Sequence, residues 1–145
     1  MSLPVVDERV LFIAPSRPEL GQVFDTLLLN GLQPVHVERF NEMGWSISDF
    51  IHVFLDVSIP GALQWLETSG EQQDEMLVIG LIQPGAREGS ALAAGAIATL
   101  QLPLEPADVL LCINRNRKRI ERHRRIKELA DRERQKMVNA SVEGV

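Results

Sequence analysis

The chain has 145 residues, of which 45% are hydrophobic, so its length and composition predict one domain with a substantial core plus an appendage. A single cysteine excludes an intramolecular disulfide and fits a cytoplasmic protein, and no apolar run approaches the roughly 20 residues of a membrane-spanning helix. The formal net charge of −5 is unevenly spread, because residues 1–113 hold fifteen acidic and four basic side chains, whereas residues 114–136 hold four acidic and eleven basic ones.

Short apolar runs and helical patterns alternate along the acidic part of the chain. The runs lack a clean polar alternation, which is typical of strands that are covered on both faces. In chain order, strands are predicted at 9–13, 34–37, 51–55, 76–82 and 98–102. Helices are predicted at 18–30, at 62–66, at 90–94 and from 105 toward the C-terminus, and the segment 41–50 has the weakest pattern.

This alternation predicts an α/β fold with a doubly wound, five-stranded parallel sheet, helices on both faces and an extended C-terminal helix. Ligands of such folds bind at the carboxyl ends of the strands, where the strand order reverses. The positions of interest are therefore Ala14-Pro15, Asp56 and Ile82-Gln83.

Two segments resemble one known family. Residues 53–61 (VFLDVSIPG) closely resemble the phospho-acceptor segment of bacterial response-regulator receiver domains, and residues 94–103 resemble the loop and fifth strand of that family up to its proline. The resemblance covers about residues 9–113 and implies the flavodoxin-like receiver fold and a signalling role without enzymatic activity. It also implies that Asp56 is the phospho-acceptor candidate and that a histidine kinase or another signalling protein is a partner.

The other positions of the family's phosphorylation site depart from the pattern. Phosphoryl transfer to a carboxylate needs a divalent cation, which the family binds with an acidic pair after the first strand. Here these positions are Ala14 and Pro15, while the family's Thr or Ser corresponds to Ile82 and its Lys to Leu102. Only Asp56 remains, so we expect no metal site and no cofactor. We also expect the side chains of Ile82 and Leu102 to pack over the pocket that forms the phosphorylation site in the family, and to close it. Mg²⁺ is expected only if Asp56 works with an atypical metal site.

The basic stretch 114–130 is predicted to be a linker helix that continues the last helix of the receiver-like domain. Apolar residues recur along it at a spacing near seven, which makes them candidates for a dimer or linker contact. These candidates are Ile113, Ile120, Ile126 and Leu129. A solvated helix face and direct contact with nucleic acid are the other interpretations of the charge, and a linker that supports a homodimer is the preferred one.

Residues 129–135 (LADRERQ) resemble the opening of the LuxR-type helix-turn-helix domain of FixJ-like regulators. The resemblance implies that 131–145 is the start of an output domain, and that the chain is a piece of a longer regulator; an accidental similarity is the alternative. Contact with DNA would then need the part of the output domain that is missing from this chain, since it has no recognition helix.

The sequence thus predicts a receiver-like domain at 1–113, a linker helix at 114–130 and the start of an output domain at 131–145. The predicted function is that of a pseudo-receiver in a two-component-type transcriptional regulator, which is cytoplasmic and acts by dimerisation and protein contact without conventional phosphorylation. One alternative is a phospho-accepting regulator that uses Asp56 with an atypical metal site. The other is a stand-alone protein-interaction module.

Overall fold

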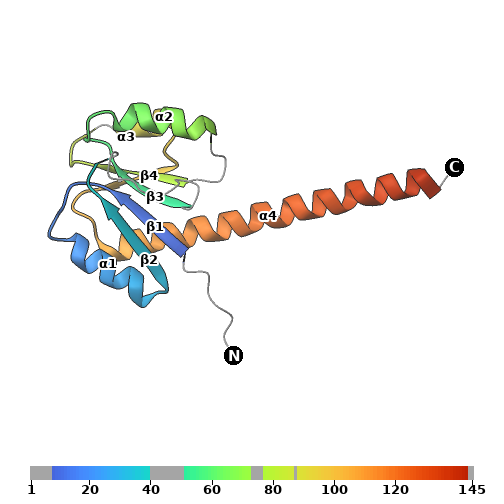
Figure 1. Ribbon diagram of the computed structural model, residues 1–145, viewed down its shortest axis with the longest axis horizontal. Coiled ribbons are helices and arrows are strands. Elements are labelled where there is room, and N and C mark those ends of the chain that lie inside the picture. Colours follow the sequence, from blue (N-terminus) through green and yellow to red (C-terminus); the bar gives the residue numbers. More distant parts are fainter. Residues whose placement is uncertain (1–7, 40–50, 73–76, 87, 144–145) are drawn as a thin grey trace. The chain divides into compact units, whose positions relative to one another are not determined.

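A computed structural model of the protein describes residues 8–39, 51–72, 77–86 and 88–143, so the weak pattern at 41–50 lies outside the described residues. Helices and strands alternate through the described ranges (Figure 1), except that β2 is followed by β3, with residues 40–50 between them outside the described part of the chain. The elements are β1 (Glu8–Ile13), α1 (Leu20–Leu29), β2 (Leu32–Val37), β3 (His52–Asp56), α2 (Ala62–Gln72), β4 (Leu77–Ile82), α3 (Glu88–Ala94), β5 (Ala98–Gln101) and α4 (Pro106–Glu143).

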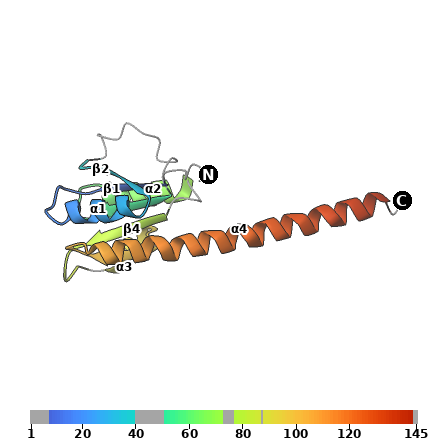
Figure 2. The same cartoon turned by 90° about the horizontal axis from the view of Figure 1, so that it is seen from below.

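The sheet has five strands in the order β2-β1-β3-β4-β5, and all neighbouring strands run parallel. This confirms the predicted doubly wound sheet. The order reverses between β1 and β3, and such a reversal leaves a crevice at the carboxyl ends of the two strands. Figure 1 shows α1 on one face of the sheet and α2 with α3 on the other, and Figure 2 shows the same elements from below.

The two faces of the sheet are packed by alternate residues of the same strands. Leu11 and Leu55 belong to a cluster with residues of α2 and α3, including Leu66 and Ala91. The intervening Phe12 faces α1 and belongs to an aromatic cluster. Its ring stacks on Phe54 with 4.9 Å between the centroids and meets Phe24 of α1 edge-on at 5.1 Å. Both faces are therefore closed by apolar side chains, which explains why the strands read as continuous apolar runs.

Some boundaries differ from the sequence prediction. β2 begins at Leu32, two residues before the predicted start at Pro34, and α2 continues to Gln72 instead of ending at 66. α1 begins at Leu20 rather than at 18. The error at β2 arises because proline usually ends a strand, but it is tolerated in a strand at the edge of a sheet.

The chain divides into two compact units, residues 1–110 and 111–145, and the boundary between them lies within α4. In the second unit, α4 is one continuous helix to Glu143, and every side chain from 121 to 139 is exposed. No helix in the described part of the chain has the length and apolar character needed to cross a membrane.

Candidate functional site

The candidate site lies at the carboxyl edge of the sheet, next to the reversal of strand order. Asp56 is the last residue of β3. In the neighbouring strands, Ala14 directly follows the end of β1, and Ile82 is the last residue of β4. Since these strands are parallel, their ends meet at one edge of the sheet. The Asp56 side chain is 1% exposed, which is an unusual degree of burial for a carboxylate.

One carboxylate oxygen of Asp56 holds the loop that follows β3. Oδ1 accepts a hydrogen bond of 2.9 Å from the backbone N–H of Ser58 and one of 2.6 Å from the Ser58 hydroxyl. Aspartate commonly ties the backbone two residues ahead in this way. Asp56 therefore has a structural role as a cap of the β3–α2 loop.

The other carboxylate oxygen faces Arg17, a residue that sequence reasoning did not connect with the site. Oδ2 of Asp56 lies 3.8 Å from Nη2 of Arg17, and Nη1 of Arg17 lies 3.8 Å from Oε1 of Glu19. We call Arg17, Glu19 and Asp56 the Arg17 cluster. Within the described residues, one buried atom of each makes no hydrogen bond: Arg17 Nε, Glu19 Oε1 and Asp56 Oδ2.

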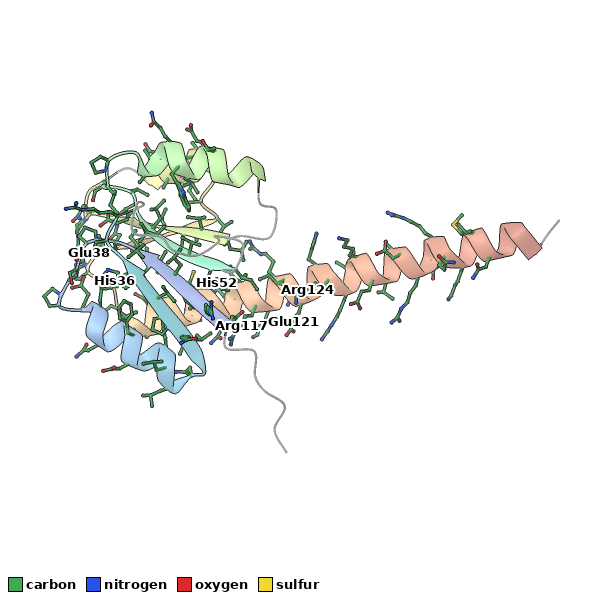
Figure 3. All side chains as sticks on the ribbon, in the orientation of Figure 1. His36, Glu38, His52, Arg117, Glu121 and Arg124 are labelled. Carbon is green, nitrogen blue, oxygen red and sulfur yellow. The ribbon has the colours of Figure 1, made fainter. Side chains whose placement is uncertain are left out.

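The β1–α1 loop that carries Arg17 is fastened to the end of β2. The Ala14 N–H donates to the Val37 carbonyl at 3.0 Å, and Nε2 of His36 lies 2.7 Å from the Ala14 carbonyl. A carbonyl only accepts, so this His36 nitrogen carries the proton. The Ser16 N–H donates to the Glu38 carboxylate at 3.2 Å, and Figure 3 labels His36 and Glu38 at this edge. The loop thus presents Arg17 from a fixed position.

The remaining positions of the predicted site bring apolar side chains to the same edge. Ala14, Ile82 and Leu102 are 1%, 1% and 3% exposed, while Pro15 is exposed. The backbone N–H of Leu102 donates to the carbonyl of Ile82 at 2.8 Å, which brings these two positions together at the ends of β4 and β5. Neither side chain offers a hydroxyl or a charge to an anion.

The residues at this edge do not fit a divalent cation. Mg²⁺ prefers an octahedron of oxygen ligands, and Ala14 and Pro15 have no side-chain oxygen. Of the two Asp56 oxygens, Oδ1 already accepts two hydrogen bonds and Oδ2 faces a guanidinium. Throughout the described ranges, no three His, Cys, Asp or Glu side chains are grouped so that they could hold a metal ion.

The candidate dimer and linker residues differ in exposure along α4. Ile113 is buried and Ile120 is half-buried, whereas Ile126 and Leu129 are 65% and 58% exposed. The structure thus divides this set into a buried first residue and an exposed distal pair.

Two further side chains, His52 and Cys112, are buried to different degrees. His52 is fully buried at the start of β3, and Figure 3 shows it away from the edge of the sheet where His36 lies. Cys112 is half-buried, and burial raises the pKa of its thiol, against smaller lowering effects from the Arg115 charge and from the Asn116 amide.

Comparison with solved structures identifies the fold. NtrX from Brucella abortus in complex with ADP superposes with a TM-score of 0.71 at 21% identity, over 83% of this chain and 28% of NtrX. A CheY-like receiver domain protein from Methanospirillum hungatei JF-1 gives 0.66 at 20% identity, over 80% and 98% of the two chains. A response regulator from Thermotoga maritima gives 0.63 at 17% identity, over 76% and 97%.

The likeness shows that this chain has the receiver-domain fold, as the sequence resemblance predicted. No protein-family model and no curated protein matches the sequence. The chain spans 28% of NtrX and 51% of a putative response regulator with a GGDEF domain, but 97% of the Thermotoga maritima regulator and 98% of the Methanospirillum hungatei protein.

Proposed function

We propose that this chain is a regulatory pseudo-receiver, which acts by protein contact and dimerisation without conventional phosphorylation of Asp56 and has no enzymatic activity. The observation that carries the proposal is the buried apolar pair Ile82 and Leu102 at the edge that holds Asp56. In a phosphorylated receiver these positions would have to offer a hydroxyl and a positive charge to the phosphoryl group.

The transition state of phosphoryl transfer spreads negative charge over the transferred group. Catalysis of this reaction depends on positioning and on electrostatic stabilisation of the three phosphoryl oxygens. Removal of one preorganised contact to developing charge commonly costs about 3 kcal/mol. A site without the acidic pair, the hydroxyl and the lysine lacks several such contacts, so a useful rate of transfer to Asp56 is not expected.

Intact mass after incubation with acetyl phosphate and Mg²⁺ tests this proposal, with Asp56→Asn as the control. No gain in mass is expected for either protein. A gain of one phosphoryl group in the parent alone would establish the alternative, in which Asp56 is a working acceptor. That alternative is favoured by one observation, since Oδ2 of Asp56 makes no hydrogen bond among the described residues.

The basic segment 114–130 is proposed to be a linker helix, and 131–145 the start of a helix-turn-helix output domain of a cytoplasmic transcriptional regulator. The continuous α4 and the exposed Ile126 and Leu129 support a role of the helix in dimer contact, because apolar side chains on an otherwise charged helix gain from burial against a second copy.

Light scattering of the Ile126→Gln and Leu129→Gln double variant tests the dimer. The matched control is Arg122→Gln with Arg125→Gln on the same helix, which removes charge and leaves the apolar side chains. We expect the apolar double variant to shift toward the monomer and the control to keep the parent's mass. Equal masses for all three proteins would remove α4 from the dimer proposal and favour the stand-alone interaction module.

A further inference from the structure

The Arg17 cluster places a positive charge where the receiver fold implies a divalent cation. Nη2 of Arg17 lies 3.8 Å from Oδ2 of Asp56, and this oxygen is the one that Ser58 leaves free. A guanidinium and a metal ion at this oxygen exclude each other, because both carry positive charge and need the same lone pairs.

We propose that Arg17 is the resident cation of this site: its guanidinium takes the place of the divalent cation and pairs with Asp56, so that the domain holds its buried carboxylate without metal. Glu19 shares the guanidinium from the other side, at 3.8 Å from Nη1. The cluster therefore holds one positive charge between two carboxylates.

Because the paired charges are largely buried, the stability of the fold depends on this ion pair. The side chains of Arg17 and Glu19 are 26% and 20% exposed, and that of Asp56 is 1% exposed. Removal of one member of a buried ion pair costs more than the pair itself contributes, because the other charge stays buried without compensation. Loss of Arg17 would leave Asp56 in this condition, whereas loss of an exposed arginine would change little.

The loop geometry supports a dedicated role for Arg17. The residues that precede it are tied to β2 through the Ala14 carbonyl and the Ser16 N–H, and the Arg17 carbonyl accepts from the Leu20 N–H at 3.2 Å at the start of α1. A fixed backbone reduces the conformational entropy that a long side chain loses when it pairs. Arg17 thus extends from a fixed backbone into the site and is not a mobile surface charge.

This inference deepens the proposed function, because a resident arginine explains how Asp56 persists in a site without metal ligands. The two claims fail separately. The mass measurement with acetyl phosphate tests the function, whereas the resident cation is tested by stability alone.

The first test is a double-mutant cycle in the full chain, with Arg17→Ala, Asp56→Asn and the combination, by urea unfolding. Arg17→Ala is expected to lower the folded-to-unfolded ratio about tenfold in the parent and less than about threefold in the Asp56→Asn background. Arg39→Ala, which removes an exposed arginine two residues after β2, is the matched control and should change the ratio little. Additive effects of Arg17→Ala and Asp56→Asn would overturn the proposal.

The second test replaces the cation from solution. Millimolar Mg²⁺ is expected to leave the parent's unfolding midpoint unchanged beyond the effect of matched ionic strength. Methylguanidinium at millimolar concentration is expected to stabilise Arg17→Ala with saturation, and not Arg17→Ala with Asp56→Asn. Saturable stabilisation of the parent by Mg²⁺ would overturn the proposal, and so would equal responses of the single and double variants to methylguanidinium.

If Arg17→Ala does not fold, Arg17→Lys carries the test. This variant keeps the charge but loses the planar fork, so it is expected to fall between the parent and the alanine variant in stability. A lysine variant whose stability is independent of whether position 56 is Asp or Asn would contradict a charge pairing at this site.

Discussion

The sheet and the distal part of α4 show two different ways in which one chain forms regular structure. All five residues of β3 are buried, whereas all side chains from 121 to 139 are exposed. The sheet is stabilised by removal of apolar surface from water, worth about 25 cal/mol per Å². The distal helix depends on intrinsic propensity and on pairs three residues apart, worth a few tenths of a kcal/mol each.

Stability and the availability of side chains for partners are thus divided between the two regions. A buried sheet unfolds cooperatively and has few side chains free for partners, while an exposed helix frays locally and presents nearly all its side chains. Figure 3 shows side chains that project outward along the length of this helix. Both tryptophans, Trp45 and Trp65, lie in the first 110 residues, so fluorescence reports that unit, and far-ultraviolet circular dichroism reports α4 as well.

The largest effect is expected from Phe54→Ala in the sheet. The ring is fully buried and stacks on Phe12, so its removal leaves a cavity and should lower the free energy of unfolding by about 3–5 kcal/mol. Urea unfolding followed by tryptophan fluorescence measures the loss. A change below about 1 kcal/mol would contradict the aromatic cluster between β1, β3 and α1.

Two glycine variants sharpen the comparison within the first unit. A Cβ at Gly80 would lie 3.1 Å from the Ala91 Cβ, so Gly80→Val should overpack β4 against α3 and cost about 1–3 kcal/mol. The same unfolding measurement applies, and a neutral Gly80→Val would show that α3 does not pack closely on β4.

The opposite sign is expected at Gly21. A Cβ there would meet nothing within 4 Å, so Gly21→Ala should stabilise α1 by about 0.5–1 kcal/mol in the same measurement.

Arg125→Pro separates the two regions most directly. Proline in a helix interior removes a hydrogen bond and costs about 3 kcal/mol locally, so the dichroism at 222 nm should fall. The free energy of unfolding that fluorescence measures should change by less than about 0.5 kcal/mol at low protein concentration, because the side chains of this stretch are not buried. Arg125→Ala is the control, and a large loss in the fluorescence transition would mean that the sheet depends on the distal helix.

The smallest effect is expected from Asp131→Asn. Its carboxylate lies 3.7 Å from Nη1 of Arg134, and the two side chains are 59% and 78% exposed. An exposed pair at this spacing contributes roughly 0.2–0.5 kcal/mol to a helix, so a slight loss of dichroism at low salt should disappear at high salt. A loss that persists at high salt would point to a role of Asp131 other than this ion pair.

The fold could be predicted because each strand is marked by an apolar run within its own sequence. The apolar runs that became β3 and β4 stop at Asp56 and Ile82, and alternation with helices implies a parallel sheet whatever the loops do. The start of β2 could not be predicted, because Pro34 breaks the sequence pattern and only its place at the sheet edge makes it acceptable.

The site was predicted only in part, because its contacts cross between elements. The position of Asp56 follows from the end of a strand, and the departures at Ile82 and Leu102 follow from the family resemblance. Arg17 gave no signal, since it lies between a serine and a proline in a loop without periodicity. Its approach to Asp56 depends on the β1–β3 pairing, on the hydrogen bond between His36 and the Ala14 carbonyl, and on the hydrogen bond that the Ser16 N–H donates to Glu38. These contacts exist only in the folded chain.

The two outer strands of the sheet also bear on the behaviour of the protein at high concentration. Outer strands present unpaired backbone groups that can template aggregation between molecules. β2 carries Pro34, which has no N–H to donate, and β5 has only four residues. Both edges thus resist the growth of an intermolecular sheet, and this protection leaves the exposed apolar side chains of α4 as the simpler route by which copies of the chain can meet.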